Sequence, residues 1–404
     1  MLTHAWFMVV LLWPVALLNY LDRQMISTMR ESIRADLPTI QSDQDFSLLM
    51  AVFMWVYAFL SPIGGFIADR FNRRWTIILS LLVWSAVTLA TGFAETLNEM
   101  IFFRALMGIS EAFYIPAALA LIADFHPGET RARAIGLHQT GIYAGLALGG
   151  FGGLIAETSS WRNAFYWFGG VGIAYSLILM RALRDAPPID STSSSGIRVS
   201  LGEALKILWG RWRFWILVLY FTLPAIAGWA MKNWLPTHLG DTYGLKQGLA
   251  GISATMYITL ASLVGVILGG ILADAWMKRT PRGRIYTSAL GTALCVPALL
   301  GLAWGSSLEV AILWTILFGL GWGLFDCNNK PILCQITRPA YRATGYGCMN
   351  LVSISIGAGA TVILGRMRDE GIAFSVAFVC CAAVNLVSVG LVLLIGIRGK
   401  DFHK

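Results

Sequence analysis

Six ionisable residues lie within long apolar stretches of the sequence, where a charge is costly. They fall in three segments and are Asp22, Arg23, Arg104, Glu111, Asp326 and Lys330. An ionisable group in such a stretch usually marks a transport pathway, a proton relay or a pair of counter-ions. The chemistry that these residues could perform is therefore proton exchange by the carboxyl groups and capture of an anion by the cationic groups.

The segment around Glu111 favours a proton carrier. Arg104 and Glu111 are seven residues apart, which puts them on one helix face, two turns from each other. Apart from Ser110, the neighbours of Glu111 are apolar or small, and a charged carboxyl is costly among them. We expect Asp22 and Arg104 to be able to pair, because both fall in the outer halves of their helices. A salt-bridge network that only fixes helix packing is the alternative.

The segment from Asp326 to Lys330 favours a small polar ligand. Lys330 together with Arg23 would suit a carboxylate, and Asn328 and Asn329 would suit hydroxyl groups. The alternative is that Lys330 only neutralises Asp326, one turn away on the same helix face.

Three further polar residues are weaker candidates. Tyr57 and Asn350 could reach the same binding site, but packing or interhelical hydrogen bonding would equally account for them. His138 could titrate near neutral pH, although a lone histidine in an apolar helix is more often a hydrogen-bonded packing residue.

The elements that carry these residues are predicted to be membrane helices. Of the 404 residues, 57% are hydrophobic and 13% are charged, and the mean hydropathy is +0.67. This composition excludes a water-soluble domain and, more firmly, a disordered chain. Hydrophobic runs predict twelve helices, at about 5–30, 46–68, 75–94, 98–123, 134–156, 163–183, 212–237, 248–273, 285–304, 309–335, 343–365 and 372–397.

The predicted helices divide into two halves. We predict an N-terminal six-helix bundle at 1–183, a cytoplasmic linker with an amphipathic helix at 184–211, and a C-terminal six-helix bundle at 212–404. The segment from Gly64 to Asp69 recurs as Gly269 to Asp274, and a basic turn follows each copy. This repetition predicts a duplicated, pseudo-symmetric unit, which is a common transporter construction.

The distribution of charge predicts the topology. Most of the Lys and Arg residues outside the helices fall on the side that also holds both termini, so both termini are predicted to be cytoplasmic. The net charge of +8 then reflects membrane topology and gives no indication of nucleic-acid binding. The six cysteines include no CxxC pair, and no nucleophile–base motif occurs, so neither a metal site nor an enzyme is expected.

The turn after the second predicted helix carries a family resemblance. Gly65-Phe66-Ile67-Ala68-Asp69-Arg70-Phe71-Asn72-Arg73-Arg74 resembles the loop two–three signature of the major facilitator superfamily, with Asn72 where glycine is usual. The resemblance implies an alternating-access transporter whose two halves rock about a central cavity. It also implies a set of cytoplasmic gating residues that do not contact the substrate, namely Gly65, Asp69, Arg73, Arg74 and Asp274.

A finer resemblance rests on the charged helix residues. Asn19-Tyr20-x-Asp22-Arg23, with Arg104 and Glu111 in the fourth helix, is similar to the anion:cation symporter family, many of whose members move sugar acids with protons. This implies that Asp22 and Glu111 are protonation sites, that Tyr20 and Arg23 contact the substrate, and that Arg104 regulates the carboxylates. The run from Arg104 to Tyr114 also resembles the spinster-type lysolipid and sphingolipid transporters.

These observations predict an all-α, multi-pass protein of the cytoplasmic (inner) membrane. We expect proton-coupled symport of a small organic anion, such as a sugar acid, by alternating access. The alternative is a lysolipid, sphingolipid or drug exporter that works as a proton antiporter. Protons are the expected coupling ion, no cofactor or metal is expected, and the protein is expected to be a monomer whose partners are the anion and the lipid bilayer, without nucleic acid.

Overall fold

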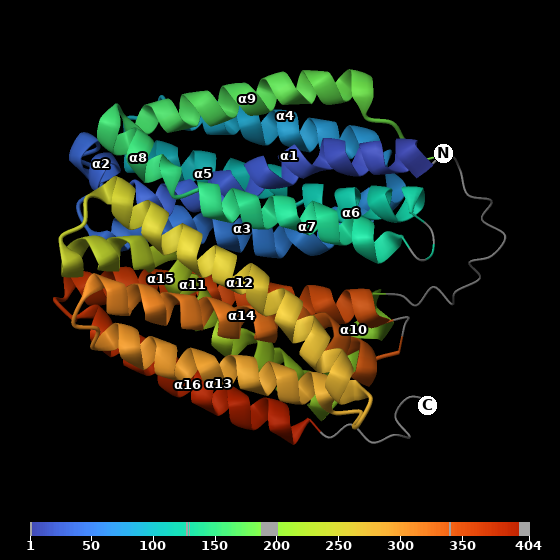
Figure 1. Cartoon of the computed structure of the whole chain (residues 1–404). Coiled ribbons are helices and arrows are strands. Elements are labelled where there is room, and N and C mark those ends of the chain that lie inside the picture. The colour runs from blue at the N-terminus through green and yellow to red at the C-terminus, as the bar shows by residue number, and fades with distance from the viewer. Residues whose placement is uncertain (1, 127, 129, 187–200, 339–340, 396–404) are drawn as a thin grey trace. The chain divides into compact units, whose positions relative to one another are not determined.

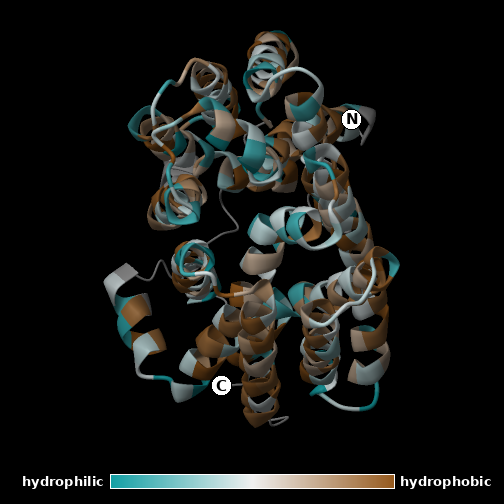
Figure 2. Cartoon of the chain, turned by 90° about the vertical axis from the view of Figure 1, so that its left-hand side faces the viewer, coloured by the Kyte–Doolittle hydropathy of each residue, from teal (hydrophilic) through white to brown (hydrophobic). Residues whose placement is uncertain are grey.

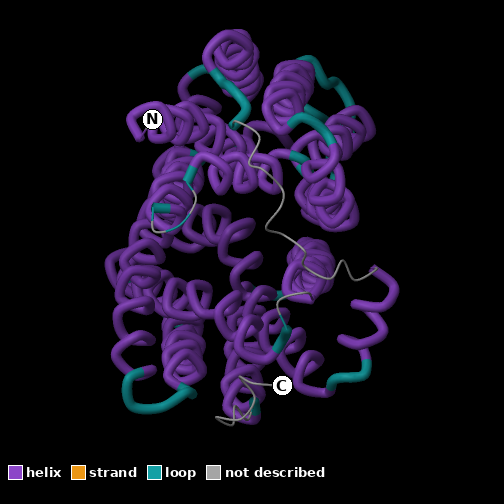
Figure 3. Tube along the Cα trace, turned by 90° about the vertical axis from the view of Figure 1, so that its right-hand side faces the viewer, coloured by secondary structure: helices purple, strands orange, loops and turns teal. Residues whose placement is uncertain are grey.

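The protein is all-helical over the residues that the computed structural model describes. These are residues 2–126, 128, 130–186, 201–338 and 341–395, and within them the side chains of 2–3, 64–70, 201, 204 and 343 are left aside. No strand occurs in these ranges, and short loops join most of the helices (Figure 3). Hydrophobic residues extend along the helices, while hydrophilic ones gather on several loops and helix ends (Figure 2).

Sixteen helices follow one another along the described parts of the chain (Figure 1). They are α1 (Leu2–Thr28), α2 (Arg30–Asp36), α3 (Asp43–Arg70), α4 (Arg73–Thr91), α5 (Leu97–Glu111), α6 (Tyr114–Phe125), α7 (Arg131–Leu148), α8 (Phe151–Thr158), α9 (Trp161–Ala182), α10 (Leu201–Trp209), α11 (Trp212–Tyr243), α12 (Gln247–Met277), α13 (Gly283–Ala303), α14 (Leu308–Ile336), α15 (Arg342–Asp369) and α16 (Phe374–Leu394). Within the described residues, eleven helical stretches are long and apolar enough to cross a bilayer, and α5 with α6 counts as one of them.

The chain forms two compact units. Unit 1 comprises Met1–Ser193 and Lys232–Met256, and unit 2 comprises Ser194–Met231 and Tyr257–Lys404. In unit 1, α1 packs along α7 and α4 packs along α9, while in unit 2 α13 packs against both α14 and α16. The domain limits at 183 and 211 stay predictions, and most of the predicted linker lies outside the described residues.

Two of the predicted helices are each divided into two pieces. The predicted fourth helix is interrupted at Ala112 and Phe113, between α5 and α6, and the freed Ser110 carbonyl accepts a hydrogen bond from the Ser80 hydroxyl. The predicted fifth helix is interrupted at Gly149 and Gly150, and α7 and α8 follow each other end to end (Figure 1). Glycine is a weak helix former, which explains the second interruption.

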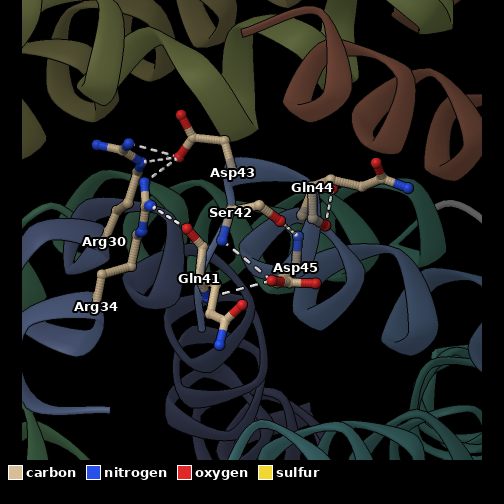
Figure 4. A network of polar contacts seen from close by, with 8 residues as sticks. Arg30, Arg34, Gln41, Ser42, Asp43, Gln44 and Asp45 are labelled. Carbon is tan, nitrogen blue, oxygen red and sulfur yellow. Dashed lines mark hydrogen bonds and ion pairs between the residues drawn. The ribbon is translucent and has the colours of Figure 1, made fainter. Parts of the chain in front are cut away.

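A network of polar contacts fixes the turn between α2 and α3 (Figure 4). Asp43 accepts hydrogen bonds at Oδ1 from Arg30 Nε at 2.6 Å and from Arg34 Nη1 at 2.8 Å. The Asp45 carboxylate accepts from the amides of Gln41 and Ser42, and the Ser42 hydroxyl accepts from the Asp45 amide at 2.9 Å. Because these contacts satisfy free amides at the start of α3, they define where that helix begins.

Glycines on α7 let α1 approach closely. A Cβ atom added at Gly145 would lie 2.2 Å from the Leu17 carbonyl oxygen, and one added at Gly141 would lie 2.7 Å from the Trp13 carbonyl oxygen. Such distances are too short for any side chain, so glycine at these positions sets the separation of the two helices. The position of α1 matters because this helix carries Tyr20, Asp22 and Arg23.

We predict that Gly145→Ala destabilises the protein by about 1–3 kcal/mol, because the added methyl group must displace the α1 backbone. The measurement is the midpoint of thermal unfolding of the purified protein. Gly136→Ala on the same helix is the control, since a Cβ there meets nothing within 4 Å. Equal midpoints for the two variants would contradict the close approach.

Candidate functional site

An ion pair between Arg23 of α1 and Glu111 of α5 is the centre of the candidate site in unit 1. Arg23 Nε donates to Glu111 Oε2 at 2.6 Å. The Glu111 side chain is completely buried, and that of Arg23 is 12% exposed. Removing one member of such a pair is strongly unfavourable, because the other charge is left buried without compensation.

Three aromatic rings surround the Arg23 guanidinium. Its central carbon lies 4.7 Å from the ring centre of Tyr20, 5.1 Å from Phe53 and 4.3 Å from Tyr57. Cations within about 6 Å of an aromatic ring are attracted to it, more strongly where water is excluded. The rings therefore stabilise the Arg23 guanidinium in addition to its ion pair with Glu111. Tyr20 and Tyr57 were predicted from the sequence, whereas Phe53 was missed, although it lies one turn from Tyr57 on α3.

Asp22 and Arg104, which were expected to be able to pair, form no ion pair with each other in the described part of this structure. Asp22 Oδ2 accepts from the Thr88 hydroxyl at 3.2 Å, and Arg104 Nε donates to the Leu49 carbonyl at 2.9 Å. The Arg104 guanidinium also faces the Phe53 ring at 4.7 Å. The spacing along the helices indicated a similar depth for both groups, but helix rotation directs Arg104 toward α3.

The predicted polar cluster of unit 2 lies on α14 and α15. Asn328 and Asn329 are buried, whereas Asp326 and Lys330 are exposed. The ammonium nitrogen of Lys330 lies 4.5 Å from the ring centre of Tyr346. Asn350 is half-buried and lies one turn beyond Tyr346 on α15. The exposed pair and the buried asparagines thus occupy different faces of α14.

The predicted gating residues hold the ends of several helices together. Arg73 forms an ion pair with Asp124 at the end of α6, and the Arg74 guanidinium donates to the Met180 carbonyl near the end of α9. In the repeated copy, Arg284 lies 3.4 Å from Asp274. Gly65 and Asp69 belong to the helical part of α3, but their side chains lie outside the described residues.

Asn72, which departs from the usual glycine, has two interactions of its own. Its side-chain oxygen accepts from the Trp75 amide at 3.0 Å and caps α4, and its amide donates to Asp185 at 2.5 Å. Asp185 also accepts from the Arg74 backbone amide at 3.1 Å. Neither Asp124 nor Asp185 was predicted from the sequence, because neither is close in sequence to the residue that it binds.

The chain is similar to several known proteins. The family model for the Major Facilitator Superfamily matches residues 12–362. The chain is 26% identical over 392 residues to protein spinster homolog 1 of Xenopus tropicalis, which covers 91% of this chain and 73% of that protein. It is 28% identical over 422 residues to the D-galactonate transporter of Escherichia coli O6:H1, covering 90% of this chain and 96% of that protein.

A solved structure has a similar fold. It is a crystal structure of a bacterial homologue of the human lysosomal transporter Spinster, in an inward-facing and unoccupied conformation. The two chains align with a TM-score of 0.78 and 21% sequence identity, over 97% of this chain and 95% of the other. At this level of identity the likeness supports the fold alone.

We predict that loss of Glu111 destabilises the protein more than loss of Arg23, because a buried carboxyl can take up a proton, whereas a guanidinium cannot give one up. Glu111→Leu is expected to cost about 3 kcal/mol or more, and Arg23→Met less, in thermal unfolding of the purified protein. Glu370→Leu, from the exposed pair with Arg366, is the control and should change stability by less than about 1 kcal/mol. An unchanged midpoint for Glu111→Leu would exclude a buried ion pair.

Proposed function

This chain belongs to the Major Facilitator Superfamily, and on that premise we propose that it moves a small organic anion across a membrane together with protons. The family is one of multi-pass membrane transporters rather than enzymes. The proposed substrate is a sugar acid or another small carboxylate, which is supported by the similarity to the D-galactonate transporter of Escherichia coli O6:H1.

The observation that carries this proposal is the buried pair of Arg23 and Glu111 within its ring of aromatic side chains. A substrate carboxylate can take the place of Glu111 beside Arg23 only if the charge of Glu111 is removed first. A proton on Glu111 removes that charge at little cost, while an unprotonated Glu111 would stay buried and unpaired. Binding of the anion and of the proton therefore favour each other, which is the requirement for symport.

Asp22 and Arg104 complete the proposed proton site. Asp22 is almost fully buried beside Thr88 and can carry a second proton, and Arg104 faces the same Phe53 ring as Arg23. In unit 2, Lys330 is proposed to bind an anionic group, and Asp326, Asn328, Asn329 and Asn350 stay candidate polar groups predicted from the sequence. No cofactor is proposed, and protons are the coupling ion.

We further propose twelve membrane spans with both termini in the cytoplasm. Eleven apolar stretches, with α7 and α8 taken together as another, make an even number, which returns the chain to the side where it began. The concentration of Lys and Arg on that side favours a cytoplasmic location. The proposed location is the inner membrane, and the proposed oligomeric state is a monomer. Arg73, Arg74 and Asp274 are proposed as gating residues.

The resemblance to spinster-type transporters, together with the similarity to protein spinster homolog 1, supports a second candidate, the export of a lysolipid, a sphingolipid or a drug in exchange for protons. Both candidates would use the same carboxylates, so the substrate distinguishes them. Proteoliposomes with an inwardly directed proton gradient should accumulate labelled D-galactonate or another sugar acid. Transport of lysophosphatidylcholine without transport of any hydrophilic anion would overturn the first candidate.

We predict that Glu111→Gln abolishes accumulation of the sugar acid under a proton gradient, because glutamine keeps an acceptor for Arg23 but cannot exchange a proton. Exchange of external for internal sugar acid, without a gradient, should continue. Glu99→Gln on the same helix is the control, since Glu99 is exposed. Full accumulation by Glu111→Gln would remove Glu111 from the coupling mechanism.

We predict that Lys330→Ala raises the half-saturation concentration for sugar-acid uptake about tenfold, which corresponds to the loss of one charge-assisted hydrogen bond. Lys206→Ala on α10 is the matched control, because Lys206 is also an exposed lysine of unit 2. Unchanged half-saturation in Lys330→Ala would exclude Lys330 from the binding site.

A further inference from the structure

A row of buried polar side chains extends from Asp22 toward the N-terminal end of α1, inside unit 1. Asp22 contacts Thr88 of α4 at 3.2 Å. Asn19 precedes Asp22 by one turn of α1, and Trp84 precedes Thr88 by one turn of α4. Because α1 and α4 run in the same direction, Asn19 and Trp84 lie at the same depth in unit 1, one helical turn from Asp22 and Thr88. Asn19 is also beside the Glu111 carboxylate.

The row continues to Tyr114 and His138. The Trp84 ring packs edge-on against the Tyr114 ring, with centres 5.4 Å apart. The Tyr114 hydroxyl lies 3.1 Å from the Leu12 carbonyl oxygen and 2.8 Å from His138 Nε2. From Asp22 to Leu12 is ten residues of helix, so the row is about 15 Å long.

The hydrogen bonds of the Tyr114 hydroxyl determine which ring nitrogen of His138 carries a hydrogen. The hydroxyl has one hydrogen, and the Leu12 carbonyl can only accept, so the hydroxyl donates to Leu12. His138 Nε2 must then carry a hydrogen and donate it to the hydroxyl oxygen. In neutral histidine the other nitrogen, Nδ1, is then bare and can accept a proton.

The bare nitrogen is buried and, among the described residues, has no hydrogen-bond partner. The same holds for Trp84 Nε1 and Asp22 Oδ1. Buried polar atoms are nearly always hydrogen-bonded, and ordered internal water commonly supplies the missing partner. These three atoms, spread along one row, therefore suit a series of internal waters.

We propose that this row is a proton path through unit 1, in which His138 takes up and releases a proton at Nδ1 while Tyr114 holds Nε2. The proton enters from water next to the Asp22 and Glu111 carboxyls and leaves to water toward the N-terminal end of α1. No other bond is made or broken. The inference rests on the proton coupling of the proposed function and adds that proton and anion can leave by separate routes.

The surroundings of His138 favour the transfer of a proton over its retention on the imidazole ring. The hydrogen-bond partner of His138 is the neutral Tyr114 hydroxyl of α6, which donates to the Leu12 carbonyl of α1. Tyr175 of α9 donates to the adjacent Leu11 carbonyl. A charged imidazolium is costly among neutral groups in a protein interior. A proton that arrives at Nδ1 therefore passes on.

The experiment uses three variants of the full chain in proteoliposomes with labelled D-galactonate. His138→Gln keeps a donor for Tyr114 at the position of Nε2 but has no basic nitrogen, and Tyr114→Phe removes the group that fixes the tautomer. Tyr175→Phe is the control, because it removes the same kind of hydroxyl-to-carbonyl bond one residue away. Each variant is measured for accumulation under a proton gradient and for exchange without one.

We expect His138→Gln and Tyr114→Phe to lower accumulation about tenfold or more, as the loss of a proton-transfer group does, and to keep exchange. Tyr175→Phe should match the wild type in both. Normal accumulation by His138→Gln, or equal loss of accumulation and exchange in all three variants, would overturn the proton path alone. Wild-type protein that exchanges the anion but ignores the proton gradient would overturn the proposed symport and the path together.

A measurement without substrate tests the assignment of the tautomer. In the nitrogen-15 spectrum of histidine-labelled protein, the signal that His138→Gln removes should be that of an Nε2-protonated ring. Tyr114→Phe should convert it to a mixture of tautomers. An Nδ1-protonated His138 in the wild type would overturn the proposal.

Discussion

The cost of leaving a charge buried without a partner is the constraint on which the rest of the structure depends. Glu111 is completely buried and meets Arg23 at 2.6 Å, so neither side chain can be left alone in its charged form. A carboxyl can escape this cost by taking up a proton, whereas a guanidinium needs another anion. Under the proposed function, this asymmetry would give the pair two permitted states, one with Arg23 bound to Glu111 and one with a proton on Glu111 and a substrate carboxylate at Arg23. The surrounding aromatic rings would stabilise the Arg23 guanidinium in both.

The helices around the pair are shaped to bring it together. Glycines on α7 let the α1 backbone approach closely, and α1 carries Arg23 and two of its neighbours. The break between α5 and α6 follows directly after Glu111, so that Glu111 ends one helix and Tyr114 begins the next. An uninterrupted helix would place these two residues on nearly the same face, one turn apart. Both residues still face α1 across the break: Glu111 contacts Arg23, and the Tyr114 hydroxyl contacts the Leu12 carbonyl and also His138 of α7.

The sequence predicted the class of fold and the residues of the pair, because charges are so scarce in apolar helices that each one is informative. It did not predict which of these charged residues form ion pairs with each other. Asp22 and Arg104 share a depth but face different neighbours, and a difference of rotation about a helix axis leaves no trace in spacing. Phe53 was missed because one phenylalanine among many in an apolar helix is not distinguished by its type. Asp124 and Asp185 were missed because their partners are far away in the chain.

Under the proposed symport, the four ionisable groups of the candidate site would also determine how transport responds to membrane voltage. Asp22 and Glu111 carry two negative charges, and Arg23 and Arg104 carry two positive charges, so the empty site is electrically neutral when all four are ionised. One proton and one monovalent anion leave this sum at zero, and the loaded site then crosses the membrane without moving net charge. A second proton, on Asp22, would make the loaded site positive, and the voltage of an energised membrane would then drive uptake. In the proposed mechanism, the number of protons carried would thus decide whether transport is driven by the pH difference alone or by the electrical potential as well.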